Sequence, residues 1–243
     1  MPCDRIAALA AHLRDTYGGV DVVVNNAGMA YGMADDTPFP EQARHTVAVN
    51  YFGTRAVCGA LLPLLRPRGR IVNVSSRAGQ WSGAMKARLD ALRGGDGGDG
   101  PAQLDALMRA FVDAAAAGTH KDQGWPGSAY GASKAGVTAL SRLLARASGG
   151  AGEGKGAGSG EAARSVTACC PGFCRTSMTQ KEGGGIVSSL FFVLGYVVGK
   201  SAYAGADTPV WLAAGAPWEE ASREGFNGCF FSGRKVVSGG FLG

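Results

Sequence analysis

The sequence contains no run of lysine or arginine, although it carries a net charge of +5 from 24 basic and 19 acidic residues. A thinly spread excess of this kind is typical of a solvated surface rather than of a nucleic-acid-binding face. Histidine is scarce, and no histidine lies near cysteines or acidic pairs at metal-ligand spacing. We therefore expect no nucleic-acid partner and no metal site. The three histidines are His12, His45 and His120.

The six cysteines form no CxxC pair and no regular framework, and no apolar secretory segment stands at the start of the sequence. These absences predict reduced thiols and a cytoplasmic location. One nearly all-apolar segment, Ile186 to Gly199, has fourteen residues. It is shorter than the ~20 residues that span a bilayer. A buried helix or a flap over an apolar pocket is favoured over a membrane-surface contact, and we expect no membrane partner.

Glycine is abundant, with 40 residues, and it is clustered. Two low-complexity segments, Gly94 to Gly100 and Ser148 to Gly160, are typical of flexible surface loops. Because sequence with folded character resumes on both sides, and because longer loops add little to the entropic cost of closure, we interpret residues 1–243 as one domain with enlarged loops.

Apolar residues change between helical and strand spacing along the chain. Helical spacing covers Ile6–Arg14, Pro40–Leu65, most of residues 81–120, and Ala129–Ala147. Buried strands are predicted at Val20–Val24, Gly69–Ser76, Ser165–Gly172 and Gly228–Val237. Strands separated by helices predict an α/β fold with a doubly wound parallel sheet, in which ligands bind at the carboxyl ends of the strands.

Tyr130 and Lys134 are spaced to share one face of the helix predicted over "SAYGASKAG". A neighbouring ammonium stabilises a phenolate and lowers the pKa of the phenol, which would make Tyr130 a proton donor to a developing alkoxide. The pair alone is a weak signal. Ser76 strengthens it, because its hydroxyl ends a predicted strand, where it could polarise a carbonyl substrate. Asn50, inside "VAVNYFGT", is interpreted from the residues alone as an ordinary exposed helical asparagine.

The motifs "NNAG", Asn50, "NVSS" and "YGASK", in this order and spacing, resemble the short-chain dehydrogenase/reductase superfamily. Longer stretches, among them "NYFGTRAVCGALLPLLRPRGRIVNVSS" and "GWPGSAYGASKAGVTALSRLLAR", resemble the NADPH-dependent carbonyl reductases. The resemblance covers most of the chain from Ile6 to Thr176 and resumes at "GADTPVWLA". It implies a Rossmann-like fold and an enzyme that reduces quinones and aromatic aldehydes and ketones to alcohols.

The resemblance also implies a role for each matching residue. Tyr130 is the catalytic acid, Lys134 its pKa-lowering and ribose-binding partner, and Ser76 orients the carbonyl. Asn50 holds a water in the proton relay, which overturns its interpretation as an ordinary helical residue. The expected NADPH contacts, besides Tyr130 and Lys134, are Asn26, Cys174, Arg175 and Thr176.

The matching substrate positions hold glutathione or its conjugates in these reductases, and they are Tyr31, Gly32, Met33 and Gln42. Phe173 stands where relatives often carry tryptophan in the substrate pocket. The vicinal pair Cys169–Cys170 is similar to one in the family, and packed core thiols are favoured over a redox-sensitive pair. The long segment between Ser76 and Tyr130 implies helices over the dimerisation face, and hence a monomer.

The glycine-rich TGxxxGxG loop, with which the family cradles the pyrophosphate, does not occur in this sequence. Aligned with the family, the chain would lack about 60 residues, comprising the first three strands and this cofactor loop. The strand at Val20–Val24 would then be an exposed apolar edge that promotes aggregation. We expect the 243-residue chain to show no measurable NADPH binding.

Two functional hypotheses follow from the sequence. In the first, the chain is an NADPH-dependent carbonyl reductase that has lost its beginning. In the second, it is a non-catalytic remnant that at most binds a partner through its open edge. The retention of Asn50, Ser76, Tyr130 and Lys134 favours the first, because a decayed copy need not keep all four.

Overall fold

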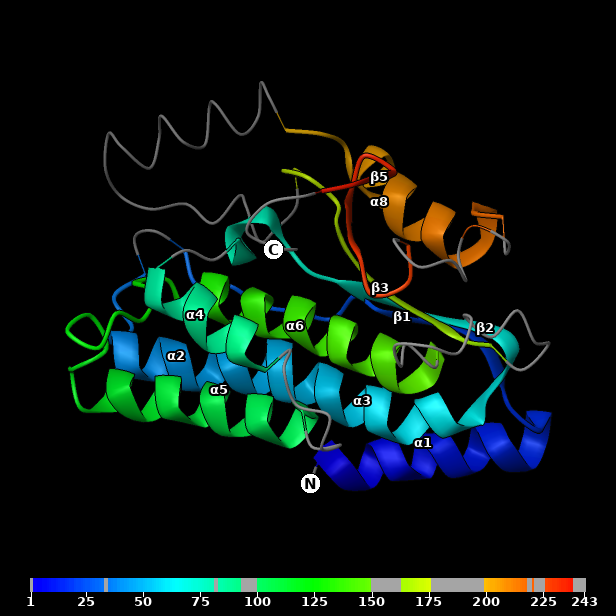
Figure 1. Cartoon of the computed structure of the whole chain (residues 1–243), viewed down its shortest axis with the longest axis horizontal. Coiled ribbons are helices and arrows are strands. Elements are labelled where there is room, and N and C mark those ends of the chain that lie inside the picture. Colours follow the sequence, from blue (N-terminus) through cyan, green and yellow to red (C-terminus); the bar gives the residue numbers. More distant parts are fainter. Residues whose placement is uncertain are drawn as a thin grey trace.

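A computed structural model describes residues 2–32, 35–80, 83–92, 100–149, 163–175, 199–217, 220 and 226–237 (Figure 1). The predicted loops at Gly94–Gly100 and Ser148–Gly160 lie largely outside these residues. The apolar segment Ile186–Gly199 lies outside them except for its last residue.

The central sheet has the order β1-β2-β3-β4-β5. Its first four strands are parallel, which confirms the predicted α/β fold: β1 (Val20–Asn25), β2 (Leu65–Val74), β3 (Ser165–Cys170) and β4 (Phe230–Ser232). Val23 pairs with Ile71, and Ile71 pairs with Val166, so the middle of the sheet is built of β-branched residues.

The last strand differs from the expectation of one strand over Gly228–Val237. The chain instead forms a hairpin, in which β5 (Lys235–Val236) pairs antiparallel with β4. Gly233 and Arg234 both have positive φ values, +61° and +60°. Two such residues in succession are typical of the two-residue turn that matches the twist of a hairpin, and this turn reverses the chain.

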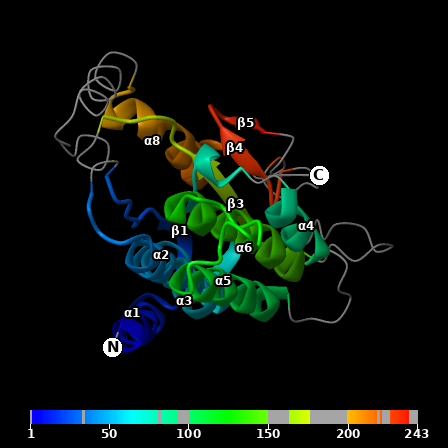
Figure 2. The same ribbon diagram turned by 90° about the vertical axis from the view of Figure 1, so that its left-hand side faces the viewer.

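Alternate residues of the strands enter two separate cores, as a doubly wound sheet requires. Ile71, Val166 and Phe230 belong to one core, while Val72 and Phe231 belong to the other. The first core lies under five helices, which Figure 2 shows together on one side of the sheet. They are α1 (Pro2–Tyr17), α2 (Phe39–Val47), α3 (Thr54–Leu61), α5 (Gly100–Ala116) and α6 (Ala129–Gly149).

The second face is covered by an element that the sequence analysis did not assign, α8 (Ala202–Val210), which continues into a π-helical turn at Trp211–Gly215. Ser201 caps α8 by accepting a hydrogen bond from the backbone N–H of Ala204 at 3.1 Å. Between β2 and α5 the chain forms a 3₁₀ turn at Arg77–Gly79 and the short helix α4 (Gly83–Ala91).

The helical stretch predicted over Pro40–Leu65 is continuous but not uniform. Between α2 and α3 the residues Ala48–Gly53 form a π-helix, and a short 3₁₀ turn, Leu62–Leu64, ends the stretch. In the described part of the chain, Phe39–Leu64 is the one helix long and apolar enough to cross a membrane. A core helix has the same composition, and Val47 and Tyr51 are fully buried in the first core.

Strand β1 lies at the edge of the sheet, and in the described residues it pairs with β2 alone. Val22 and Val24 point away from the helical core and remain 41% and 43% exposed. The nearest charge, Asp21, is paired with Arg66 at 2.6 Å. The edge therefore offers unpaired backbone groups beside an apolar surface, with no free charge of its own to repel another strand.

We expect Val24→Lys to lower the tendency of the chain to self-associate, because a lysine on an edge strand opposes strand pairing. Light scattering at increasing protein concentration measures this effect. Leu9→Lys is a matched control, since Leu9 is 46% exposed and lies on the helix α1 rather than on a strand. Equal effects of the two substitutions would show that the edge of β1 does not drive association.

Candidate active site

Tyr130 and Lys134 lie in the first two turns of α6, which is seated on the chain that follows β2. Ser128 caps the start of the helix by accepting from the Gly131 N–H at 3.0 Å. A Cβ at Gly131 would lie 2.8 Å from the Ala78 carbonyl oxygen, and one at Gly79 would lie 2.6 Å from the Ala135 nitrogen. Only glycine at both positions allows this approach, which brings Ser76 to the tyrosine.

The two serines at the end of β2 have different environments. Ser75 is buried, and its hydroxyl donates to the Lys134 carbonyl oxygen at 2.8 Å, with Thr138 equally close. Ser76 accepts from the Ala78 N–H at 3.1 Å, and its hydroxyl lies close enough to the Tyr130 side chain to lower the pKa of the phenol. The structure thus brings Ser76 to Tyr130, as predicted, and shows Ser75 in contacts that support the helix.

Lys134 is a buried cation, with 4% of its surface exposed. Its ammonium donates to the Val74 carbonyl oxygen at 2.7 Å and lies 5.7 Å from the centre of the Tyr130 ring. Burial lowers the pKa of Lys134 to about 8, opposed by the nearby thiols Cys169 and Cys170. Tyr130 and Lys134 thus share one face of α6, as their spacing in the sequence predicts.

The pKa of Tyr130 does not shift in the expected direction. Burial raises the pKa of Tyr130, and the nearby Ser76 hydroxyl opposes this increase only in part. The Lys134 ammonium donates to the Val74 carbonyl oxygen. The prediction of a lowered Tyr130 pKa is wrong for this state of the protein, in which the phenol is held as a neutral acid.

Asn50 is not the ordinary exposed helical residue that its position alone suggested. It lies in the π-helix and is fully buried. Its side-chain oxygen accepts from the Met29 N–H at 2.7 Å. Its amide nitrogen donates to the Met29 carbonyl at 2.9 Å and to the Ser133 hydroxyl at 3.0 Å. Asn50 therefore clamps the loop after β1 to the start of α6.

The two asparagines of "NNAG" have different environments. Asn25 points under the sheet, where its amide donates to the Asn73 side-chain oxygen at 2.7 Å. Asn26, the predicted cofactor contact, is exposed at the carboxyl end of β1. Gly28 follows, and a Cβ there would lie 3.2 Å from the Asn50 side-chain oxygen and 3.3 Å from the Lys134 ammonium. Gly28, Val74 and Ser133 stand inside the motifs "NNAG", "NVSS" and "YGASK", but no role is predicted for any of them from the sequence.

The chain after β3 carries three of the predicted residues. Phe173 is 51% exposed, and Arg175 is exposed beside it. The backbone of Cys174 forms an isolated β-bridge with that of Lys200. The Cys174 sulfur packs closely on α8, so that a Cβ at Gly205 would lie 2.2 Å from it. Thr176 lies outside the described residues.

The vicinal thiols Cys169 and Cys170 are buried at the end of β3. Burial raises the pKa of Cys169 to about 12, with a further increase from Cys170. A thiol in this state is a poor nucleophile, which supports the interpretation of Cys169 as a packed core residue. The five cysteines whose side chains are described are all free.

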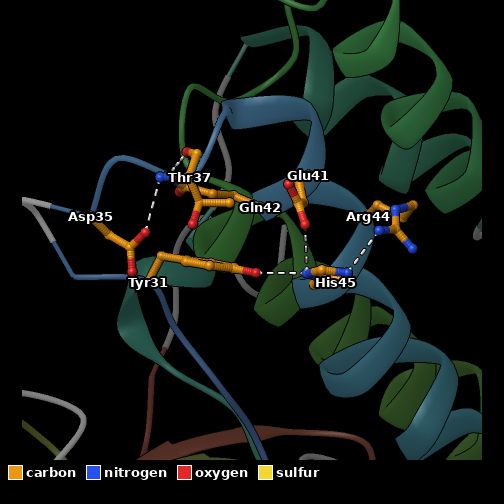
Figure 3. A network of polar contacts seen from close by, with 7 residues as sticks. All are labelled: Tyr31, Asp35, Thr37, Glu41, Gln42, Arg44 and His45. Atoms are coloured by element: carbon orange, nitrogen blue, oxygen red, sulfur yellow. Dashed lines mark hydrogen bonds and ion pairs between the residues drawn. The ribbon is translucent and has the colours of Figure 1, made fainter.

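The residues expected at a glutathione position take part in a polar network on the loop before α2 (Figure 3). The Tyr31 hydroxyl lies 2.7 Å from Nδ1 of His45, whose Nε2 accepts from Arg44 at 2.8 Å. The Gln42 amide donates to the Thr37 carbonyl at 2.7 Å. Gly32 lies in the same loop, and Met33 is outside the described residues. The sequence analysis did not associate Arg44 and His45 with this loop.

Comparison with known proteins places these features in context. A family model described as short chain dehydrogenase matches residues 2–88. Carbonyl reductase [NADPH] 1 of Mus musculus is 40% identical over 238 residues, which cover 95% of this chain and 74% of the mouse protein. The Homo sapiens protein of the same name is 41% identical, with the same coverage. Salutaridine reductase from Papaver somniferum, at 23% identity and a TM-score of 0.70, shares the fold over 95% of this chain and 79% of its own.

The buried ammonium of Lys134 makes the stability of the protein depend on pH. Its pKa is about 8 in the folded protein and 10.5 in its ordinary state, so folding is opposed by the full cost of burying the charge below pH 8. As the pH rises from 8 to 10.5, the folded state releases its proton first and becomes more stable relative to the unfolded state.

Substituting Lys134→Met removes this dependence. Between pH 7 and pH 10, we expect the free energy of unfolding of the wild type to rise by about 2 kcal/mol relative to that of Lys134→Met. Denaturant unfolding at the two pH values measures the shift. A difference that stays constant with pH would contradict the lowered pKa.

Proposed function

The chain belongs to the short-chain dehydrogenase/reductase superfamily, and from this premise we propose that its site reduces carbonyl compounds to alcohols with NADPH. The observation that carries the proposal is the meeting of a neutral phenol, a hydroxyl and a buried ammonium at the carboxyl end of β2. Tyr130 and Lys134 come from α6 and Ser76 from the end of β2, and the packing of α6 on this strand end brings the three together.

Each side chain then has a role that its environment supports. The Tyr130 phenol, kept neutral by burial, donates its proton to the carbonyl oxygen as the oxygen gains negative charge. The Ser76 hydroxyl holds the same oxygen and polarises the carbonyl. Lys134 stabilises the phenolate that remains. Asn50 keeps a water in line for proton return, through its backbone carbonyl, which also accepts from Thr54 at 2.8 Å.

The residues present fit the nicotinamide end of NADPH. In the described residues the Lys134 ammonium has one hydrogen-bond partner, the Val74 carbonyl, so two of its N–H groups remain for ribose hydroxyls. Gly28 leaves open the space beside it that a Cβ would fill. Asn26, Cys174, Arg175 and Thr176 are the further proposed contacts. When bound, NADPH supplies the hydride.

The proposed substrates are quinones and aromatic aldehydes and ketones. Phe173 lies in the chain that follows β3, and its half-exposed ring supports an aromatic substrate. Glutathione adducts are proposed at Tyr31, Gly32, Met33 and Gln42. The structure adds a constraint, because the Tyr31 and Gln42 side chains already bond to His45 and Thr37 and would have to share these partners.

We also propose a monomer in a reducing cytoplasm. Helix α5 packs against α2 and α6, and the Tyr51 hydroxyl donates to Asp105 on α5 at 2.7 Å. This helix covers the face through which a second copy would pack. The free state of the described cysteines supports the compartment.

A second candidate function is that of a non-catalytic interaction module. The open edge of β1, with its exposed valines, favours it.

Turnover separates the two functions. Consumption of NADPH with a quinone substrate is measured at cofactor concentrations on the order of 1 mM, so that weak binding still populates the complex. We expect Tyr130→Phe to lower kcat by about 10²- to 10⁴-fold, the usual contribution of a positioned acid. Tyr203→Phe is the control, because Tyr203 is 92% exposed on α8. Equal rates for the wild type and Tyr130→Phe, or no turnover at all, would favour the interaction module.

A further inference from the structure

Two serines of α6 are fully buried, and the hydroxyl of each links the side chain of a buried asparagine to the backbone of α6. The Ser133 hydroxyl donates to the Tyr130 carbonyl at 2.8 Å and accepts from the Asn50 amide at 3.0 Å. The Ser141 hydroxyl donates to the Val137 carbonyl at 2.9 Å and accepts from the Asn73 amide at 2.8 Å. The two contacts are chemically the same, but the asparagines they hold are in different places.

The protons around Asn50 can all be assigned. Its amide nitrogen has two N–H groups, and these point to the Met29 carbonyl and the Ser133 hydroxyl. Because the Ser133 oxygen accepts there, its own proton is directed to the Tyr130 carbonyl. The Asn50 oxygen is left to accept from the Met29 N–H. The Met29 backbone, with one donor and one acceptor, sets the orientation of the Asn50 amide, and Ser133 is the acceptor that satisfies its second N–H.

We propose that Ser133 is a positioning residue for the carbonyl reduction proposed above, on which this inference rests. Ser133 ties the turn of α6 that carries Tyr130 to the π-helix that carries Asn50. Through Asn50 it also holds Met29, and with it the adjacent Gly28 that lies against the Lys134 ammonium. Without the Ser133 hydroxyl, one N–H of Asn50 would be buried with no acceptor, and the amide would reorient at the expense of the Met29 clamp.

Ser141 has no such connection. The asparagine that it holds, Asn73, accepts from Asn25, so this chain joins β1, β2 and α6 below the sheet. It supports the fold and touches none of the proposed reacting groups. Ser141→Ala is therefore a matched control for Ser133→Ala, since each substitution removes one buried hydroxyl that satisfies one buried amide.

The first measurement is steady-state kinetics on the full chain. We expect Ser133→Ala to lower kcat by about 10- to 100-fold, the usual cost of misplacing a reacting group. KM should change by less than about 2-fold, because substrate contacts are retained. Ser141→Ala should leave both constants near those of the wild type, and Ser133→Thr, which keeps the hydroxyl, should restore kcat. Equal losses of kcat in the two alanine variants would overturn the proposal.

The second measurement does not need activity. Hydrogen exchange at the Met29 amide reports the clamp directly, because this N–H is bonded to Asn50. Ser133→Ala should accelerate exchange at Met29 more than it destabilises the whole protein, whereas Ser141→Ala should not.

If the wild type shows no turnover, the proposed function fails, and the exchange at Met29 still decides whether Ser133 positions Asn50. If Ser133→Ala does not fold, Ser133→Cys, with a weaker acceptor, should show the same local acceleration, and unchanged exchange there would overturn the proposal.

Discussion

The contact between α6 and the carboxyl end of β2 is the constraint on which the rest of the site depends. Gly79 and Gly131 permit the backbone of the helix to lie directly on the turn after the strand. Ser75 then bonds to the Lys134 carbonyl, and the Lys134 ammonium bonds to the Val74 carbonyl. Helix and strand end are thus tied in both directions. Tyr130 and Ser76 meet because the two backbones have already been brought together.

The electrostatics of the site follow from its burial rather than from attraction between its charges. Burial raises the pKa of the Tyr130 phenol and lowers that of the Lys134 ammonium, so both groups are moved toward their neutral forms. An acid that must release a proton only when charge develops on a bound carbonyl gains from this arrangement, since it does not ionise beforehand. Burying the Lys134 charge costs free energy, which is offset by the packing of the buried residues next to Lys134 along α6.

Much of this arrangement could be predicted from the sequence, and the failures have physical causes. The strand and helix order follows from periodicity, and the shared face of Tyr130 and Lys134 follows from their spacing. Asn50 could not be placed from local pattern, because a π-helix has no apolar signature of its own and the partners Met29 and Ser133 are distant in sequence. The hairpin at Gly233 and Arg234 resembles one strand in the sequence, because its two-residue turn is short and β-favouring residues stand on both sides of it. The direction of the Tyr130 pKa shift is set by the burial of the phenol, and residue spacing does not determine burial.

The π-helix between α2 and α3 has a consequence for how this segment tolerates change in length. A π-helical turn holds one residue more than an α-helical turn, and the extra residue is accommodated as a local bulge within the helix. Deleting one residue of Ala48–Gly53 would restore the regular α-helical winding and leave the buried faces of α2 and α3 in their present relation. Such a deletion would instead remove the bulge that carries Asn50 into its contacts with Met29 and Ser133. The helix can therefore lose a residue and keep its core, whereas the site that depends on the bulge cannot.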